Sequence, residues 1–321
     1  MNKKLKMKKD WVYRIDKWAK NNNVILPKDR QSILELSSLD LSPHELMMTC
    51  IDMKTGKRVG GNVLNGVLTK IPKEIGNLIG LRRLTITTNK LKILPKEIGN
   101  LINLRELTLA FNGLIELPKE IGKLTNLTTL NVTLEYLRTV PKEIGELTNL
   151  TTLNLRDNRL IELPKEIGKL TNLTTLNLGK PSYTFFKANL THSIILPKEI
   201  SKLINLTTLD LRGNGFVEVP KEIIKLTNLT TLDLSGNRLE ELPKEIVLLK
   251  KLKYLYLNNM DLILTKEQKL WIKELKEKNN CFVSIDKISP FKILYIYFQK
   301  FIKNNLKSIN KQNQNKKTTE Y

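Results

Sequence analysis

The sequence is poor in the residues that build disulfide frameworks, metal centres and many catalytic sites. Its 321 residues include two cysteines, Cys50 and Cys281, and two histidines, His44 and His192. Two cysteines make neither a disulfide framework nor a metal cluster, and they fit a reducing compartment. Neither histidine stands in a metal-ligand spacing. A catalytic Cys50–His44 pair is conceivable, but no third member is identifiable, so a buried structural cysteine is the favoured interpretation.

Long apolar runs are also missing. No stretch reaches the roughly 18 apolar residues of a transmembrane helix, and the basic segment 1–10 leads to no apolar core of a signal peptide. We therefore expect a cytoplasmic protein, for which export would need an unconventional route. The phosphate-loop motif is absent as well. We expect no cofactor, no metal, no small-molecule substrate and no enzymatic activity.

Acidic residues are too few to balance the basic ones, and the excess is uneven. The net charge is +22, of which residues 1–71 carry +7, residues 72–264 carry +7 and residues 265–321 carry +8. Basic ends can contact nucleic acid or a membrane surface. A solvated, solubilising surface is the simpler interpretation, and we favour it over nucleic-acid binding.

A four-residue motif, Pro-Lys-Glu-Ile, occurs eight times in the chain. It begins at Pro72, Pro95, Pro118, Pro141, Pro164, Pro197, Pro220 and Pro243. The spacing is 23 residues at every step except the 33-residue step from Pro164 to Pro197. A second phrase, L-x-x-L-x-L-x-x-N-x-L, lies between the copies. A fixed period of this length predicts a solenoid, whose long preformed surface makes binding the default function.

Each repeat is expected to begin with a short strand. Leu153 and Leu155 lie two residues apart and face the core, while Thr152 and Asn154 face outward. Stacking the units predicts a parallel sheet with a defined set of outward residues. That set is Arg83, Thr85, Glu106, Thr108, Thr129, Asn131, Thr152, Asn154, Thr175, Asn177, Thr208, Asp210, Thr231, Asp233, Tyr254 and Tyr256.

An asparagine follows most strands, at Asn89, Asn112, Asn158, Asn214 and Asn237. Its amide can bond backbone groups of its own and the adjacent unit. Glu135, Pro181 and Met260 interrupt this pattern, so altered turns are expected there. In the return limb, proline starts a short helix or 3₁₀ turn and a glycine such as Gly145 ends it. The Asn-Leu-Thr triplets match the glycosylation sequon but are interpreted as by-products of the repeat.

These motifs resemble the leucine-rich repeat, strongly over about residues 64–264. The wording L-P-K-E-I-G-x-L-T-N-L is similar to a bacterial subclass related to Ras-suppressor and plant intracellular Ras-group proteins. The resemblance implies an α/β solenoid, a curved horseshoe with a parallel β-sheet on the concave side and short helices or 3₁₀ turns on the convex side. It also implies protein binding, because most family members bind other proteins.

The two ends are expected to close the core. Trp11, Ile15 and Trp18 share one helical face, and Thr265 with Gln268 forms a capping-box pattern before a second tryptophan helix. The chain then divides into an N-terminal capping helix with a degenerate first repeat (1–43), an insert (44–66), the repeats (67–264, with an insert near 179–193), a C-terminal cap (265–289) and an apolar, then basic, partly disordered tail (290–321).

Candidate partner-binding residues include departures from the repeat consensus, such as Arg83, Glu106, Phe111, Tyr254 and Tyr256, together with residues on the outward face and at the strand ends. They are Arg83, Glu106, Phe111, Asn154, Arg156, Tyr183, Phe185, Phe186, Arg212, Asp233, Tyr254 and Tyr256. The three aromatic residues of the insert either bind a partner or fold over the neighbouring units. The Thr/Asn centre of the sheet is either a binding surface or solvated consensus.

The sequence predicts a non-catalytic, monomeric scaffold that binds a protein partner, of unspecified identity, on the concave face. One alternative is contact of the basic ends with a membrane surface or nucleic acid, with segment 291–303 touching the membrane weakly instead of packing on the cap. The other is a bacterial effector that acts on a host protein.

Overall fold

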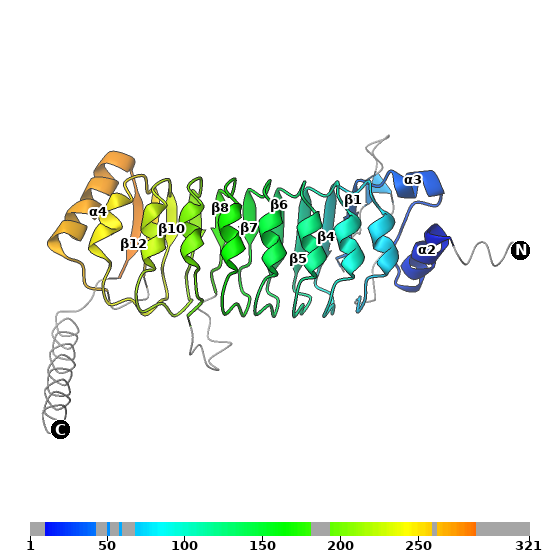
Figure 1. Cartoon of the computed structure of the whole chain (residues 1–321), viewed down its shortest axis with the longest axis horizontal. Coiled ribbons are helices and arrows are strands. Elements are labelled where there is room, and N and C mark those ends of the chain that lie inside the picture. Colours follow the sequence, from blue (N-terminus) through cyan, green and yellow to red (C-terminus); the bar gives the residue numbers. More distant parts are fainter. Residues whose placement is uncertain are drawn as a thin grey trace, which may run out of the picture.

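The computed structural model describes residues 10–42, 50–51, 58–59, 68–180, 193–258 and 262–286. This part of the chain is a linear stack of repeat units (Figure 1). Helices α2 (Trp11–Asn21) and α3 (Arg30–Leu34) lie at its N-terminal end, and α4 (Lys266–Asn279) lies at its C-terminal end. None of the helices in the described ranges is both long enough and apolar enough to cross a membrane.

Ten parallel strands form one open, uncurled sheet, in the order β1-β4-β5-β6-β7-β8-β9-β10-β11-β12. They are β1 (Ser38–Asp40), β4 (Arg83–Thr87), β5 (Glu106–Ala110), β6 (Thr129–Thr133), β7 (Thr152–Asn154), β8 (Thr175–Asn177), β9 (Thr208–Asp210), β10 (Thr231–Asp233), β11 (Tyr254–Leu257) and β12 (Phe282–Ile285). The predicted outward residues pair with one another, as Thr152 does with Thr175 and Asn154 with Asn177. The predicted register is therefore confirmed.

A separate antiparallel pair joins β2 (Cys50–Ile51) to β3 (Arg58–Val59). It lies within the predicted insert between the first repeat and the regular units. Cys50 pairs with Val59 and Ile51 with Arg58. The residues between the two strands lie outside the described ranges.

Each return limb forms a 3₁₀ helix opposite the sheet (Figure 1). These helices are η1 (Lys73–Asn77), η2 (Lys96–Asn100), η3 (Lys119–Lys123), η4 (Lys142–Glu146), η5 (Lys165–Lys169), η7 (Lys198–Lys202), η8 (Lys221–Lys225) and η9 (Lys244–Leu248). Proline precedes each one as its N-cap, with Pro141 at φ −63° and ψ 146°. It therefore sets the entry to the turn without being a residue of it.

The turn glycine has a different role from the one its position in the sequence suggested. Gly145 lies inside η4 and does not end it. A Cβ atom at Gly145 would lie 2.6 Å from the carbonyl oxygen of Glu166 in the next turn. Glycine is required because neighbouring turns approach this closely.

Leucine and isoleucine side chains fill the space between the sheet and the 3₁₀ helices. Leu153, Ile144 and Leu147 are fully buried, and the same positions are buried along the stack. At the N-terminal end, Ile15 of α2 closes this core. At the C-terminal end, Trp271 of α4 does so, and Thr265 and Gln268 form the expected capping box.

The asparagines that follow the strands form the predicted hydrogen-bonded ladder. Asn158 Nδ2 donates to the carbonyl of Val132 in the preceding unit at 2.7 Å and to Leu155 of its own unit at 2.9 Å. Its Oδ1 accepts from the N–H of Leu137 at 3.2 Å. We call this buried row the inner ladder. It satisfies backbone groups that the turn would otherwise leave unpaired.

Glu135 replaces asparagine in the inner ladder and makes the altered turn expected there. It is 2% exposed and accepts from the N–H groups of Asn112 at 2.9 Å, Leu114 at 2.6 Å and Gly113. Burial raises the pKa of this carboxyl, and the N–H donors oppose that rise. Pro181 and Met260, the other two interruptions, lie outside the described residues.

The Asn-Leu-Thr triplets build two further rows that the sequence analysis did not assign. Asn149 Nδ2 donates to the carbonyl of Thr125 at 2.8 Å, and Thr151 Oγ1 donates to the carbonyl of Thr128 at 3.0 Å. The exposed asparagine row, here called the outer ladder, comprises Asn103, Asn126, Asn149, Asn172, Asn205 and Asn228. Repetition of the triplet therefore reflects hydrogen bonding between units.

Candidate functional site

The outward side of the sheet is a broad surface that no described helix covers, because the 3₁₀ helices pack on the other side (Figure 1). We call it the strand face. Its centre carries small side chains at Thr152, Thr175 and Thr208, which are half-buried by their neighbours. Small residues leave the sheet open to close approach by another molecule.

Two predicted site residues at the N-terminal part of the strand face pair with each other. Arg83 Nε lies 2.6 Å from Glu106 Oε2, and its Nη2 lies 3.0 Å from Glu106 Oε1. The hydrogen bond and the charge of Glu106 raise the pKa of Arg83. The hydrogen bond from Arg83 lowers the pKa of Glu106. This exposed pair is a two-point contact between adjacent strands, and such pairs contribute little stability.

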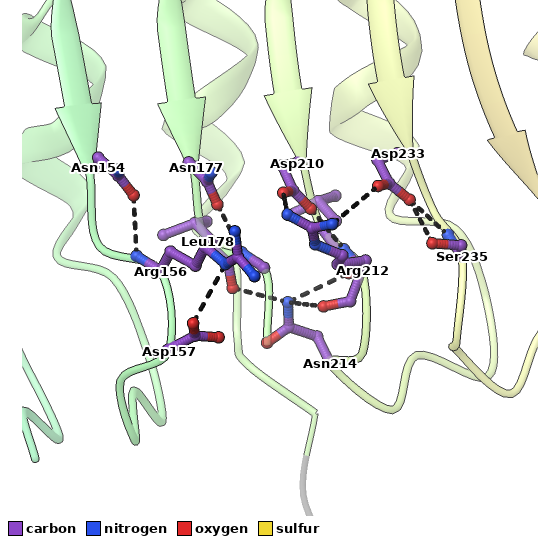
Figure 2. A network of polar contacts seen from close by, with 12 residues as sticks. Asn154, Arg156, Asp157, Asn177, Leu178, Asp210, Arg212, Asn214, Asp233 and Ser235 are labelled. Carbon is purple, nitrogen blue, oxygen red and sulfur yellow. Dashed lines mark hydrogen bonds and ion pairs between the residues drawn. The ribbon is translucent and has the colours of Figure 1, made fainter. Parts of the chain in front are cut away.

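A charged cluster lies where β7 to β10 end (Figure 2). It consists of Arg156, Asp157, Asp210, Arg212 and Asp233. Arg212 Nη2 lies 2.9 Å from Asp210 Oδ2, and its Nη1 lies 3.9 Å from Asp233 Oδ2. Arg156 Nε lies 3.1 Å from Asp157 Oδ2. The structure thus brings together three predicted residues, Arg156, Arg212 and Asp233, with two that were not predicted.

Asx turns explain why asparagine and aspartate recur at the strand ends. The N–H of Arg156 donates to Asn154 Oδ1 at 3.1 Å, and the N–H of Arg212 donates to Asp210 Oδ1 at 3.0 Å. Each side chain therefore bonds its own backbone two residues on. Asn154 was expected to be a binding residue, and the role that the structure shows for it is this local hydrogen bond.

Gly179 separates the two arginines, and its missing side chain shapes the cluster. A Cβ atom there would lie 2.5 Å from Asp210 Oδ1. Figure 2 shows the Arg156 side chain extending from its own strand toward β8. Burial raises the pKa of Asp210, while the N–H and the charge of Arg212 oppose the rise. Burial also raises the pKa of Asp157 and lowers that of the neighbouring Lys180.

Some polar atoms of the cluster make no hydrogen bond within it. The buried atoms Arg212 Nε and Asp157 Oδ1 have no hydrogen-bond partner within the described ranges, and Arg156 Nε makes only the ion pair with Asp157. The side chains of Arg156 and Arg212 are 40% and 33% exposed, against 8% for Asp157 and 11% for Asp210. The arginines are therefore accessible from outside. Guanidinium groups in this setting can donate to carboxylate or carbonyl oxygens of a partner.

An aromatic cluster ends the strand face at its C-terminal side. Tyr254 and Phe282 are 48% and 55% exposed, and they pair across β11 and β12. The ring centroids of Tyr256 and Phe282 lie 5.8 Å apart. The tyrosines were predicted and Phe282 was missed. Period-two alternation in the final strand would have placed Phe282 on the same face as Tyr254.

The remaining predicted residues lie elsewhere. Phe111 is not on the strand face. It follows the last residue of β5 with φ 55° and lies along the edge formed by the C-terminal ends of the strands. Tyr183, Phe185 and Phe186 lie outside the described residues.

A hollow of about 280 Å³ lies at the opposite edge, where the strands begin. Its lining residues are Gly80, Arg82, Asn103, Arg105 and Asn126. Gly80 takes the outer-ladder position of its unit. Both arginines are exposed, so the hollow is basic and open to solvent.

Comparison with known proteins supports the assignment of the fold. A family model described as a leucine-rich repeat region matches residues 69–177 and 191–315. No match was found among curated proteins. A solved leucine-rich repeat protein of Leptospira interrogans is 34% identical, with a TM-score of 0.55, over 84% of this chain and 72% of that protein.

This chain is also similar to a part of each of two plant receptors. The Arabidopsis thaliana receptor GASSHO1/SCHENGEN3, solved with CASPARIAN STRIP INTEGRITY FACTOR 2, is 27% identical with a TM-score of 0.54, over 68% of this chain and 25% of that chain. The Arabidopsis receptor kinase HAESA, solved with the peptide hormone IDA and the co-receptor SERK1, is 26% identical with a TM-score of 0.53, over 68% of this chain and 35% of that chain. The repeat period, the sheet register and these matches agree, and the chain belongs to the leucine-rich repeat family.

Proposed function

We propose that the chain is a non-catalytic interaction module that binds a protein partner on its strand face. The observation that carries the proposal is the outer face of the ten-stranded parallel sheet, which no helix of the described ranges covers. Parallel sheets are normally covered on both faces. A protein partner would supply the second cover. Leucine-rich repeat folds are typical of protein-protein interaction modules, which supports this function.

The strand face offers three kinds of contact to such a partner. The threonine centre allows close approach, the accessible arginines 156 and 212 donate hydrogen bonds, and the aromatic cluster at Tyr254 and Phe282 supplies apolar anchors. Aromatic and arginine residues often dominate interface energies. A preformed sheet orders little on binding, so few contacts suffice.

The plant ectodomains solved with peptide or protein ligands support the class of partner, although the chain spans only 25% and 35% of their length. We also propose that the chain is a monomer and that it is located in the cytoplasm. Action on a host protein is a narrower form of the same proposal.

The test is a pair of matched substitutions. Thr175→Arg places a long cation at the centre of the strand face, and Thr148→Arg places the same side chain at an exposed edge position. Each variant and the parent would be used as bait in a matched cell lysate at low and high salt. We expect a discrete protein to be retained at high salt by the parent and by Thr148→Arg, and to be lost at least about tenfold by Thr175→Arg.

Equal retention by all three baits would refute binding on the strand face. The basic hollow at Arg82 and Arg105 favours a second candidate function, binding of an anionic surface or polymer. Such binding would fall steeply with salt and would be the same for both threonine variants.

A further inference from the structure

The N-terminal units carry bulky side chains at a backbone position that favours glycine. One repeat position, just beyond the strand, adopts positive φ in most of the described units. It is Gly213 and Gly236 in two C-terminal units, but Thr88, Phe111 and Leu134 in three N-terminal units, with φ of 55°, 55° and 57°, and Asp157 in the unit that follows them, with φ of 59°. A side chain at positive φ costs conformational free energy, and such residues gather at functional sites.

One apolar surface at these strand ends is formed by Phe111, Leu134 and a third residue, Tyr136, which does not have positive φ. Phe111 and Leu134 are successive in the stack, and the N–H of Phe111 donates to the carbonyl of Thr133 at 3.2 Å. Phe111 is 57% exposed, Leu134 is 37% exposed and Tyr136 is 46% exposed. A Cβ atom added at Gly113 would lie 3.6 Å from Tyr136 Cε2, so the tyrosine ring lies over that glycine. We name Phe111, Leu134 and Tyr136 the apolar edge patch.

Basic side chains surround the apolar edge patch. The Arg159 guanidinium lies 4.3 Å from the centre of the Tyr136 ring and stacks on it. The exposed charged residues of this edge, over the four units concerned, are Lys90, Lys92, Arg138 and Arg159, against Glu116 and Glu162. The surroundings therefore favour a ligand with negative charge.

We propose that the apolar edge patch binds an acidic segment of another protein, one that carries a large aromatic or aliphatic side chain. Exposed aromatic residues flanked by arginine are common anchors in interfaces, and complementary charge selects the partner. A second copy of this chain, at net charge +22, does not complement the basic surroundings. Segment 291–302 of the chain has lysines and no acidic residue, so it does not complement them either.

This surface is distinct from the strand face. Phe111 follows the last residue of β5, and the patch lies at the edge of the sheet in the N-terminal units. The aromatic cluster of the strand face lies in the last two strands. The two surfaces can therefore be tested separately.

The experiment selects phage-displayed random dodecapeptides on the immobilised full chain. The double variant Phe111→Asn/Leu134→Asn removes the side chains from the patch and keeps the turn, because asparagine tolerates positive φ. Its thermal midpoint is expected to equal or exceed that of the parent. Ile204→Asn, at an apolar position that is 59% exposed and outside the patch, is the matched control. Tyr254→Ala is the control on the strand face.

We expect the parent to enrich peptides that combine aspartate or glutamate with one large apolar residue. Enrichment on the double variant should be at least about tenfold lower than on the parent, while enrichment on both controls should equal that on the parent. The proposal is overturned by no enrichment over the bare support, by basic peptides in the selected pool, by equal enrichment on the double variant, or by loss with Tyr254→Ala. Failure of the strand-face proposal would leave this result unaffected.

Discussion

The two halves of the solenoid place glycine at opposite ends of the repeat. In the N-terminal half it lies inside the 3₁₀ turn, at Gly76, Gly99, Gly122, Gly145 and Gly168, where the C-terminal half has Ser201, Ile224 and Val247. At the positive-φ position beyond the strand the pattern reverses. The C-terminal half has Gly213 and Gly236 there, and the N-terminal half has Thr88, Phe111, Leu134 and Asp157. The same core thus tolerates two different backbone solutions.

The reversal separates two uses of glycine. In the turns, glycine permits close contact between neighbouring units. At the strand ends it relieves positive φ. The N-terminal half has glycine in its 3₁₀ turns but not at the positive-φ positions beyond its strands. These positions therefore combine conformational strain with exposed side chains. Substitutions at matched positions of the two halves test this difference.

Gly145→Ala is expected to have the largest effect on stability. The added Cβ would lie 2.6 Å from the carbonyl oxygen of Glu166 and 2.7 Å from its Cβ, so two backbones must separate. Overpacking of this kind costs about 1–3 kcal/mol, and we expect the upper end because the clash is with backbone. Urea unfolding followed by circular dichroism measures the loss.

Ser201→Ala is the matched control in the C-terminal half, since Ser201 occupies the same place in η7 and already carries a Cβ. It should change the free energy of unfolding by less than about 0.5 kcal/mol. Equal losses for both variants would show that close approach of the turns is not what separates the halves.

Much of this architecture could be predicted from the sequence. Alternating leucines determined which strand residues face outward, because the side-chain period of a strand is two. The inner ladder and the capping box at Thr265 also followed, since each depends on residues at a fixed local spacing. Solenoids suit such reasoning because every unit repeats the same local environment.

The rest depended on distances between units. The packing role of Gly145, the approach of Arg212 to Asp233 and the position of Phe111 all arise from how one unit contacts the next or from the φ angle of a turn. A consensus pattern does not encode these distances. Phe282 was missed for a simpler reason, namely that the predicted set of outward strand residues ended at Tyr256.

Glu135→Asn is expected to have the next largest effect, a gain in stability. It lies beside Leu134 on the N-terminal edge, where a buried carboxylate replaces the ladder amide. Asparagine at position 135 would donate to the carbonyl of Leu109, just as Asn158 donates to Val132, and would remove a buried charge. We expect a gain of about 1 kcal/mol at neutral pH.

The direction of the Glu135 pKa shift determines how this gain in stability depends on pH. Burial raises the folded-state pKa of Glu135, so the folded chain binds the proton more tightly than the unfolded chain. The parent therefore loses stability as pH rises from the ordinary glutamate value through the raised one, and the gain in Glu135→Asn should shrink in acid. Glu116→Asn, at an exposed position of the same edge, should stay within about 0.5 kcal/mol of the parent. A gain that does not vary with pH would refute the assignment.

Gly236→Ala is expected to have an effect no larger than that of Glu135→Asn and of opposite sign, and it compares the positive-φ positions of the two halves directly. Gly236 has φ 65°, and the nearest atoms to an added Cβ lie 3.6 and 3.7 Å away. Space is available, so the cost is conformational alone, about 1 kcal/mol. Phe111→Ala, at the same position of the other half, already bears a Cβ at φ 55° and should change stability by less than about 0.5 kcal/mol. If thermal unfolding shows Gly236→Ala to be neutral, positive φ carries no strain in this turn, and Phe111 and Leu134 are held at the edge at no cost to the fold.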